Sequence, residues 1–416
     1  MTAKATPVAI RFGTLYAGDG TIHRNGVLAI EDGRIASLGD APVADGAIVI
    51  DAPCVVPGLI NAHVHLEVSG EAETMSLYVL TTPVQRAFAC ADNARKTLEA
   101  GVTAVRDLGG SERLAIDLRD AIAAGRIVGP EIVAAGRLIT MTGGHGYFFG
   151  READGPDDVR KAVREQRKAG ARCIKFMATG GVLTKGAVPG TSQLTETELR
   201  AGIDEAHRHG MKAAAHAIGA DGIKNALRAG IDSIEHGHLI DGEGVALLVE
   251  RGAAIVPTLA ALDRIGDAGP DAGMPAFVVE KARRIADVAA ENLRAARAGG
   301  ARFVAGSDAG TPFNRHADFA HELELMQRWL GMSASEVVTA ATRDAALLLD
   351  IDRGLIEPGA VADVVALPRD PDSDARPFRD PLAVVKDGAL VYMRTTALTT
   401  APVSESWIAS EMRSNG

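Results

Sequence analysis

The middle of the chain alternates short apolar segments with longer, alanine-rich segments of amphipathic character. This alternation is typical of a parallel sheet whose strands are connected by helices. The short apolar segments span residues 58–65, 102–108, 131–136, 173–178, 212–217, 232–236, 254–259 and 302–308. Eight strands with eight helical returns predict an α/β fold of the (β/α)8 TIM barrel type.

The two ends of the chain have a different pattern, with short apolar runs interrupted by Gly and Asp. Such runs are typical of strands and turns. Because both ends share this pattern, we expect residues 1–57 and 358–416 to form one small β-sandwich domain. Residues 58–357 would then form the barrel.

Composition and charge narrow the class of protein. Apolar residues make up 47% and charged residues 24% of the 416 residues, which excludes a disordered chain. The net charge of −10, without a basic stripe, argues against a nucleic-acid partner. Three widely spaced cysteines argue against a disulfide framework, and no apolar run approaches a membrane span. We therefore expect a cytoplasmic protein without a membrane partner.

Polar residues stand at or near the carboxyl ends of five predicted strands, where the active site of a barrel lies. They are His63, His65, Lys175, His216, His236 and Asp308. The two-residue period of a strand directs both His63 and His65 into the barrel. Lys175 stands inside an apolar strand, and lysine is almost never fully buried without a partner. Imidazole and carboxylate groups that converge in this way suit zinc and neighbouring divalent metals.

Lys175 could act as a bridge between two metal ions. Its amine would react with CO2 to form an anionic carbamate with two oxygen atoms. This reaction needs a neutral amine, and burial favours the neutral form because it lowers the pKa of lysine. An aspartate beside two metals, such as Asp308, could hold one ion and also accept a proton from water.

Several segments together resemble the amidohydrolase superfamily. They are VVPGLINAHVHLE, IKFMATGG around Lys175, AAAHAIG around His216, SIEHGH around His236, and SDAGTPFNRH around Asp308. The later segment ATRDAALLLDIDRGLIEPGAVADVVAL is also similar to that superfamily. The resemblance extends from about residue 8 to residue 392. It is strongest to the branch of imidazolonepropionase-like proteins and Xaa-Pro dipeptidases (prolidases).

The resemblance implies two divalent metal ions, with Zn²⁺ expected. His63, His65 and Asp308 would bind one ion, and His216 and His236 the other. Lys175, carboxylated by CO2, would bridge them. Asp308 would take the proton of the attacking hydroxide and pass it to the leaving amine. These roles imply a hydrolase that cleaves an amide or peptide-type C–N bond in a small molecule, such as a dipeptide or an N-acyl amino acid.

Substrate contacts are expected from His145 and His238. Glycines flank His145, as in the similar GGHG segment that lies at the substrate in prolidase-like proteins. His238 follows His236 by two residues and either faces the site or bonds to loop backbone. Ile218 stands where some prolidase-like relatives have a tyrosine. The Gly- and Pro-containing segments 179–195 and 260–277 should form loops at the rim of the pocket.

Other functions remain open at this stage. A metal-dependent deaminase is one, although deaminases of this superfamily generally have a glutamate where this chain has Gly219. A cyclic-amide hydrolase is another. A non-enzymatic scaffold is disfavoured because such relatives usually lose metal ligands, and this chain retains all six. The branch also implies a homo-oligomer.

Overall fold

The computed structural model describes residues 6–40, 42–111, 113–268, 272–372 and 374–394. Within these ranges, strands from both ends of the chain join in one mixed sheet of seven strands, in the order β17-β16-β15-β4-β1-β2-β3. Their bounds are Val8–Tyr16 (β1), Ile22–Glu31 (β2), Arg34–Gly39 (β3), Ile48–Pro57 (β4), Val364–Leu367 (β15), Ala383–Lys386 (β16) and Ala389–Met393 (β17). The expected sandwich of two sheets is not confirmed. Residues 395–416 of the predicted terminal domain lie outside the described residues.

Two hairpins of this sheet use the same turn chemistry. Asp32-Gly33 joins β2 to β3, and Asp387-Gly388 joins β16 to β17, with positive φ at all four residues. Two-residue turns of this kind require positive φ at both positions, which Asp-Gly tolerates well. A Cβ atom on Gly388 would lie 2.4 Å from the Cα atom of Gly33, so the two turns touch.

The parallel strands of the middle segment form two groups. One has the order β5-β6-β7 and the other β14-β13-β12-β11-β10-β8-β9. The bounds are Leu59–Val64 (β5), Val102–Asp107 (β6), Glu131–Ala134 (β7), Ile139–Thr140 (β8), Arg151–Glu152 (β9), Cys173–Met177 (β10), Lys212–Gly219 (β11), Ser233–Leu239 (β12), Ala254–Val256 (β13) and Arg302–Phe303 (β14). All eight predicted strands are present, and the α/β class with parallel strands is confirmed.

Backbone hydrogen bonds connect the two groups of strands. The amide of Arg172 donates to the carbonyl of Ala134, over 2.9 Å, beside β7. On the other side, Ala62 donates to Ala305 over 3.0 Å, and Asp308 donates to His63 over 2.8 Å. The chain after β14 therefore lies beside β5, although the eighth strand itself is shorter than the predicted 302–308.

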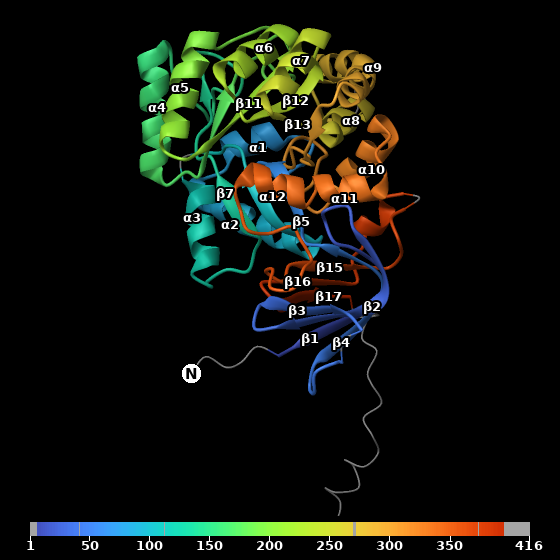
Figure 1. Ribbon diagram of the computed structural model, residues 1–416. Coiled ribbons are helices and arrows are strands. Elements are labelled where there is room, and N and C mark those ends of the chain that lie inside the picture. Colours follow the sequence, from blue (N-terminus) through green and yellow to red (C-terminus); the bar gives the residue numbers. More distant parts are fainter. Residues whose placement is uncertain (1–5, 41, 112, 269–271, 373, 395–416) are drawn as a thin grey trace, which may run out of the picture.

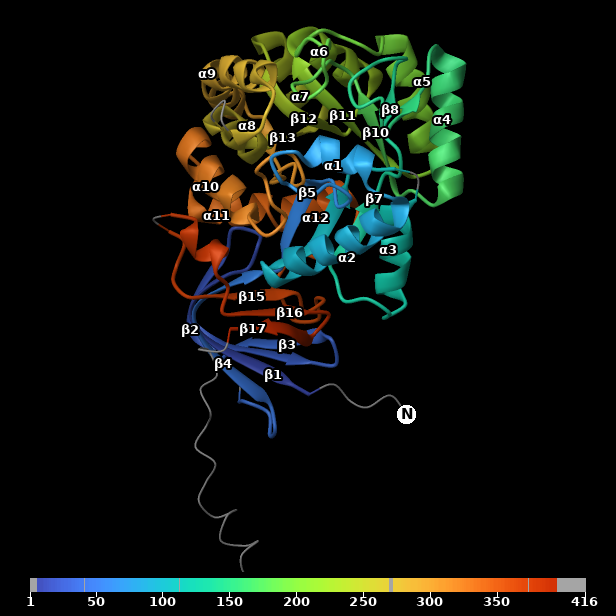
Figure 2. The same ribbon diagram turned by 180° about the vertical axis from the view of Figure 1, so that it is seen from behind.

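Helices lie along the outside of these parallel strands, and the terminal sheet lies at one end of the molecule (Figures 1 and 2). The helices are Thr74–Leu80 (α1), Pro83–Glu99 (α2), Leu114–Ala123 (α3), Pro156–Ala169 (α4), Glu196–Arg208 (α5), Ala220–Ala229 (α6), Gly242–Arg251 (α7), Leu259–Asp267 (α8), Ala276–Ala298 (α9), Phe319–Leu330 (α10), Ala334–Ala340 (α11) and Arg343–Leu349 (α12). A short 3-10 turn covers Arg376–Arg379.

One sequence expectation about the loops is wrong. Segment 260–277 was expected to be a loop, but α8 occupies its first part and α9 begins within it. Residues 269–271 of this segment lie outside the described residues. Segment 179–195 is irregular as expected, and two isolated bridges, Thr179 with Ser192 and Gly180 with Pro189, hold it together.

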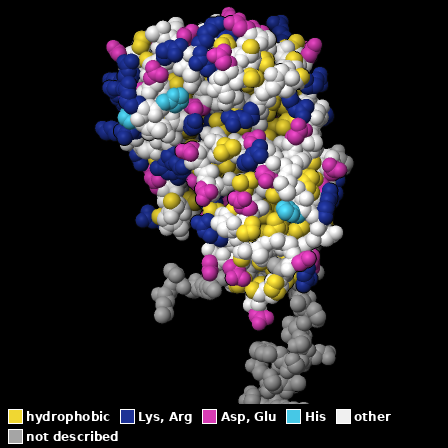
Figure 3. All heavy atoms as spheres, viewed as in Figure 1, with side chains coloured by type: hydrophobic (Ala, Val, Ile, Leu, Met, Phe, Trp, Pro, Cys, Tyr) yellow, Lys and Arg dark blue, Asp and Glu magenta, His cyan; other side chains and the backbone are white. Residues whose placement is uncertain are grey.

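The surface and the helices give two further observations. On the face drawn in Figure 3, acidic and basic side chains are interspersed. Among the described residues, no helix combines the length and the apolar character that crossing a bilayer requires.

Candidate active site

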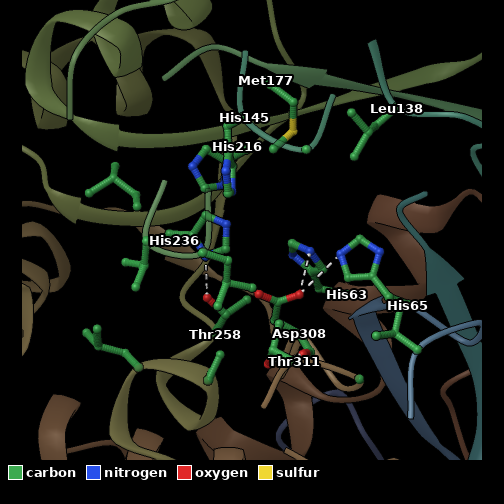
Figure 4. Close-up of a pocket in the computed structure, with 18 of the residues that line it drawn as sticks. His63, His65, Leu138, His145, Met177, His216, His236, Thr258, Asp308 and Thr311 are labelled. Atoms are coloured by element: carbon green, nitrogen blue, oxygen red, sulfur yellow. Dashed lines mark hydrogen bonds and ion pairs between the residues drawn. The ribbon is translucent and has the colours of Figure 1, made fainter. Parts of the chain in front are cut away.

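A cavity lies at the carboxyl ends of the parallel strands, and its empty space is about 910 Å³ including the open mouth. All eight site residues expected from the sequence line it, and Figure 4 shows several of them facing one another. They come from β5 (His63 and the adjacent His65), β10 (Lys175), β11 (His216), β12 (His236 and His238), and the loops that carry His145 and Asp308. The fold thus brings together residues up to 245 positions apart in the sequence.

Three of these residues form a tight group. Nε2 of His63 lies 3.3 Å from Oδ1 of Asp308, and Nε2 of His65 lies 3.2 Å from the same oxygen. The Nδ1 atoms of both rings are occupied, by Glu235 at 2.8 Å and by the carbonyl of Gly109 at 2.6 Å. The Nε2 atoms are therefore the free ligand atoms, and they converge on one carboxylate oxygen.

Asp308 is held by its own backbone. Its φ of +58° lies in the left-handed region, which costs energy for a residue with a side chain. Thr311 donates a hydrogen bond to the Asp308 carbonyl over 2.7 Å, and Asn314 donates over 3.0 Å. Burial favours the protonated carboxyl, but the neighbouring His63 and His65 hold the pKa of Asp308 well below its usual range. The group is therefore a carboxylate at neutral pH.

The second group consists of His216, His236 and Lys175. The rings of His216 and His236 lie 4.5 Å apart, centroid to centroid, and the His236 ring lies 5.4 Å from that of His63. The hydroxyl of Thr258 donates to the carbonyl of Pro257 over 2.8 Å, so it accepts a hydrogen bond from Nδ1 of His236 at 2.7 Å. This leaves Nε2 of His236 free to act as a ligand.

Burial keeps three of the site histidines neutral and brings the pKa of Lys175 closer to neutral pH. It lowers the pKa of His63 to about 4 and takes the pKa of His216 and His236 well below its usual value. Burial likewise lowers the pKa of Lys175 to about 8. Burial acts on His65 in the same direction, but the contact with the negatively charged Asp308 raises the pKa of His65 above its usual value. Neutral rings keep a lone pair available for a metal ion.

The first group fits a divalent metal ion. The ligand atoms of His63, His65 and Asp308 all lie within 4.8 Å of one another. Among the described residues, no hydrogen bond reaches the buried Oδ1 of Asp308. A buried polar atom without a hydrogen bond is costly, and a cation between the two Nε2 atoms and this oxygen would compensate for the missing bond. Two imidazoles and a carboxylate are a suitable donor set for zinc.

His145 and His238 lie at the edge of the groups. Nδ1 of His145 lies 2.7 Å from the hydroxyl of Thr184, and its ring lies 4.6 Å from that of His216. Nε2 of His238 donates to the carbonyl of Pro257 over 2.8 Å, while its buried Nδ1 has no hydrogen-bond partner among the described residues. Both alternatives for His238 therefore apply, since it bonds to backbone and lines the cavity.

Comparison with known proteins adds the family. The sequence profile of the Amidohydrolase family matches residues 54–391. The chain belongs to the amidohydrolase family. It is 30% identical to ochratoxinase of Aspergillus niger, and the match covers 92% of this chain and 85% of ochratoxinase. The imidazolonepropionase of Nocardia farcinica is 27% identical, with 83% and 86% of the two chains covered.

Solved structures agree with this assignment. A Xaa-Pro dipeptidase with methionine bound in its active site superposes with a TM-score of 0.86 and 32% identity, and the match covers 94% of this chain and 100% of that one. The branch with prolidases and imidazolonepropionases that the sequence motifs indicated is confirmed. The amidohydrolase is thus a hydrolytic enzyme that acts on amide bonds.

The walls of the amidohydrolase cavity are apolar on two sides. Near the His216 and His236 side the wall includes Ile218, Leu262 and Ile265, which belong to one apolar cluster. Near His65, the wall includes Phe149, whose ring lies 6.1 Å from that of His65. Ile218, where the sequence resemblance leads us to expect a tyrosine in some relatives, is part of this apolar cluster. The cavity therefore suits a substrate with apolar groups.

Sequence reasoning missed the polar residues behind the first group. Glu235 and Arg106 are fully buried. Glu235 contacts Nδ1 of His63, and Arg106 donates a hydrogen bond to the carbonyl of Ala62. Asn61 accepts hydrogen bonds from the amides of His63 and Ser307, at 3.2 and 3.0 Å. Asn61 thereby holds strand β5, which carries His63, beside Ser307. A charged side chain inside an apolar strand is the signal that singles out Lys175, and the same signal is present at Arg106.

Proposed function

We propose that the amidohydrolase is a metal-dependent hydrolase that cleaves an amide or peptide-type C–N bond in a small molecule, such as a dipeptide or an N-acyl amino acid. The observation that carries the proposal is the convergence of the Nε2 atoms of His63 and His65 on the buried Oδ1 of Asp308. The proximity of His216, His236 and Lys175 in the same cavity supports it.

The proposed site holds two divalent ions, with zinc as the expected metal. His63, His65 and Asp308 would hold one ion, and His216 and His236 the other. Bound there, the ions would polarise the scissile carbonyl and activate the attacking water. The neutral state of His63, His216 and His236 supports this assignment, because a protonated ring could not act as a ligand.

Lys175 is proposed to carry a carbamate that bridges the two sites. Its Nζ would form a bond to the carbon of CO2 and release a proton, which gives an anionic group with two ligand oxygens. Burial lowers the pKa of Lys175 to about 8, so a useful fraction of the amine is neutral at neutral pH. The carbamate would also place a negative charge among the metal ligands.

Asp308 is proposed to be the general base and then the general acid. Its carboxylate, held by Thr311 and Asn314 through the backbone, would accept the proton of the attacking water. It would then deliver that proton to the nitrogen of the leaving amine. His145 and His238 are proposed to contact the substrate, since both line the cavity beside the histidine groups.

The apolar walls of the cavity favour substrates that carry apolar groups beside the amide bond. A substrate whose apolar groups pack on Leu262 and Ile265 on one side, and on Phe149 on the other, would place its amide between the histidine groups. Burial of such groups contributes roughly 25 cal/mol per Å² of apolar surface. N-acyl amino acids or amides with aromatic or aliphatic groups therefore fit the cavity well.

The remaining proposals concern architecture and assembly. We propose that residues 58–357 form a closed (β/α)8 barrel, which the backbone hydrogen bonds on both sides of β5-β6-β7 support. Residues 1–57 and 358–416 would form the accessory domain. A cytoplasmic homo-oligomer is also proposed. The homo-oligomer is supported by four exposed apolar side chains on α1 and α2, namely Val79, Leu80, Val84 and Phe88.

A hydrolysis screen tests the proposed function. Protein supplied with zinc would be incubated with Xaa-Pro and other dipeptides, N-acyl amino acids and aryl amides, and the released amine would be measured. The proposal predicts hydrolysis of at least one class, with a preference for apolar substituents and loss of activity after chelation. Metal-loaded protein that hydrolyses no member of any class would contradict it.

A further inference from the structure

A chain of buried polar contacts lies behind the first group of the active site. Nδ1 of His63 lies 2.8 Å from Oε2 of Glu235, and the other oxygen of Glu235 lies 2.8 Å from a terminal nitrogen of Arg106. The exposed fractions of His63, Glu235 and Arg106 are 1%, 0% and 1%. Charged groups are seldom so deeply buried unless they are paired.

The contacts of Arg106 give this chain a defined geometry. Its Nε donates to the carbonyl of Ala62 over 2.7 Å, so Arg106 holds the backbone next to His63. Another of its nitrogens donates to the hydroxyl of Ser233 over 3.0 Å, and that hydroxyl donates to Glu235 over 2.6 Å. Strands β5, β6 and β12 are thus joined by side chains at the depth of His63.

The direction of the proton follows from these contacts. A carboxylate only accepts hydrogen bonds, so Nδ1 of His63 must be the donor in the contact with Glu235. The lone pair of the ring is then on Nε2, the atom that faces Asp308 and His65. A ligand histidine whose second nitrogen is held by a carboxylate is oriented and made more basic.

We propose that Arg106 and Glu235 are a positioning pair for His63, which keeps its ring in the tautomer and orientation that bind the first metal ion. This inference rests on the proposed function, since it requires His63 to be a ligand. Arg106 neutralises the Glu235 carboxylate and so lets a charge reside in the barrel interior. The pair acts on the first metal site, although Glu235 is adjacent in sequence to His236 of the second.

The chain offers a matched network outside the active site. Glu205 on α5 is also buried, with an exposed fraction of 2%, and it contacts Arg164, Arg208 and His209. It combines the same residue types as the Arg106, Glu235 and His63 set, but it does not line the cavity. Loss of its charge should lower stability without an effect on metal binding, which makes Glu205→Gln the control for a purely structural role.

The experiment compares metal binding in purified full-length variants. Glu235→Gln removes the charge, and the double variant Arg106→Gln with Glu235→Gln removes both charges, so that neither is left unpaired. Zinc content would be measured after dialysis, and zinc affinity by competition with a chelator. We expect both variants to bind one of the two ions about 10- to 100-fold more weakly. The other ion should bind as in the wild type, and Glu205→Gln should retain both ions.

His63→Ala separates this inference from the proposed function. If His63→Ala binds as much zinc as the wild type, the proposed metal site is wrong. If His63→Ala loses an ion but both Glu235 variants keep wild-type affinity, only the positioning role is wrong.

The protonation of the His63 ring can be measured in the wild type, so this test does not depend on whether the Glu235 variants fold. In zinc-loaded protein with 15N-labelled histidine, the ring signal that disappears in His63→Ala should show a protonated Nδ1. A protonated Nε2 would overturn the inference.

Discussion

Replacement of Asp308 by asparagine separates proton transfer from the other roles of this side chain. Asparagine has nearly the same size and keeps one oxygen that can face the Nε2 atoms of His63 and His65. In the wild type these atoms lie 3.3 and 3.2 Å from Oδ1 of Asp308. The hydrogen bonds from Thr311 and Asn314 reach the backbone carbonyl of residue 308, so they remain. The position of the side chain should therefore be preserved, while its capacity to take a proton is lost.

The expected loss follows from the role of a general base. Such a group contributes about 10²- to 10⁴-fold to the rate, so kcat of Asp308→Asn should fall by that factor. This corresponds to about 3–5 kcal/mol of transition-state stabilisation, since each tenfold change in rate is about 1.4 kcal/mol. The second metal ion should remain bound, because His216, His236 and Lys175 are unchanged.

The assay is steady-state hydrolysis of the best substrate of the screen, with zinc content measured on the same sample. Asp363→Asn is the matched control, because Asp363 is also buried and forms an ion pair of 2.6 Å with Arg353. Asp363 does not line the cavity. Asp363→Asn should lower the thermal midpoint and leave kcat within about twofold, as expected for a residue outside the site. Near-normal turnover of folded Asp308→Asn would refute the base assignment and direct attention to His238.

Three other changes test separate parts of the site. Lys175→Ala should lose most activity and bound metal, and a short carboxylic acid should restore part of both by supplying bridging oxygens; absence of any rescue would argue for a plain amine. His145→Ala should lower kcat/KM and leave zinc content intact, whereas loss of zinc would make His145 a ligand or a folding residue. Leu262→Asp should lower kcat/KM for substrates with apolar groups by about 10-fold or more, because it places a charge against an apolar group. Equal rates for Leu262→Asp and wild type would show that this wall does not contact the substrate.

The residues of the two histidine groups could be found from the sequence because strand period and strand ends are local properties. His63 and His65 follow from the alternation of side chains along a strand, and Lys175 from its place inside an apolar one. Parallel strands in this fold all end on the same side, so residues such as His216 and Asp308 are brought together by topology alone. The prediction that His216 and Asp308 lie close together therefore does not require knowledge of their individual contacts.

The features that were missed depend on contacts between distant segments. The sequence predicts a loop where α8 lies, because Gly, Pro and Asp are frequent in that segment. The first turn of α8 is held by the buried side chain of Glu322, whose oxygens accept hydrogen bonds from the amides of Leu259 and Ala260, 63 and 62 residues away in sequence. Glu235 contacts His63 across 172 residues. No local pattern reports such pairs, so their roles emerge only from the folded chain.

The zinc content of purified wild-type protein tests the central claim most directly. After loading with zinc and dialysis, we predict about two zinc ions per chain, with one lost in His63→Ala and activity lost in parallel with metal on chelation. Two ions would require both groups of the cavity, including His216, His236 and Lys175, to act as ligands. A wild-type protein that retains no zinc, or that hydrolyses amides equally well after complete removal of metal, would contradict the account.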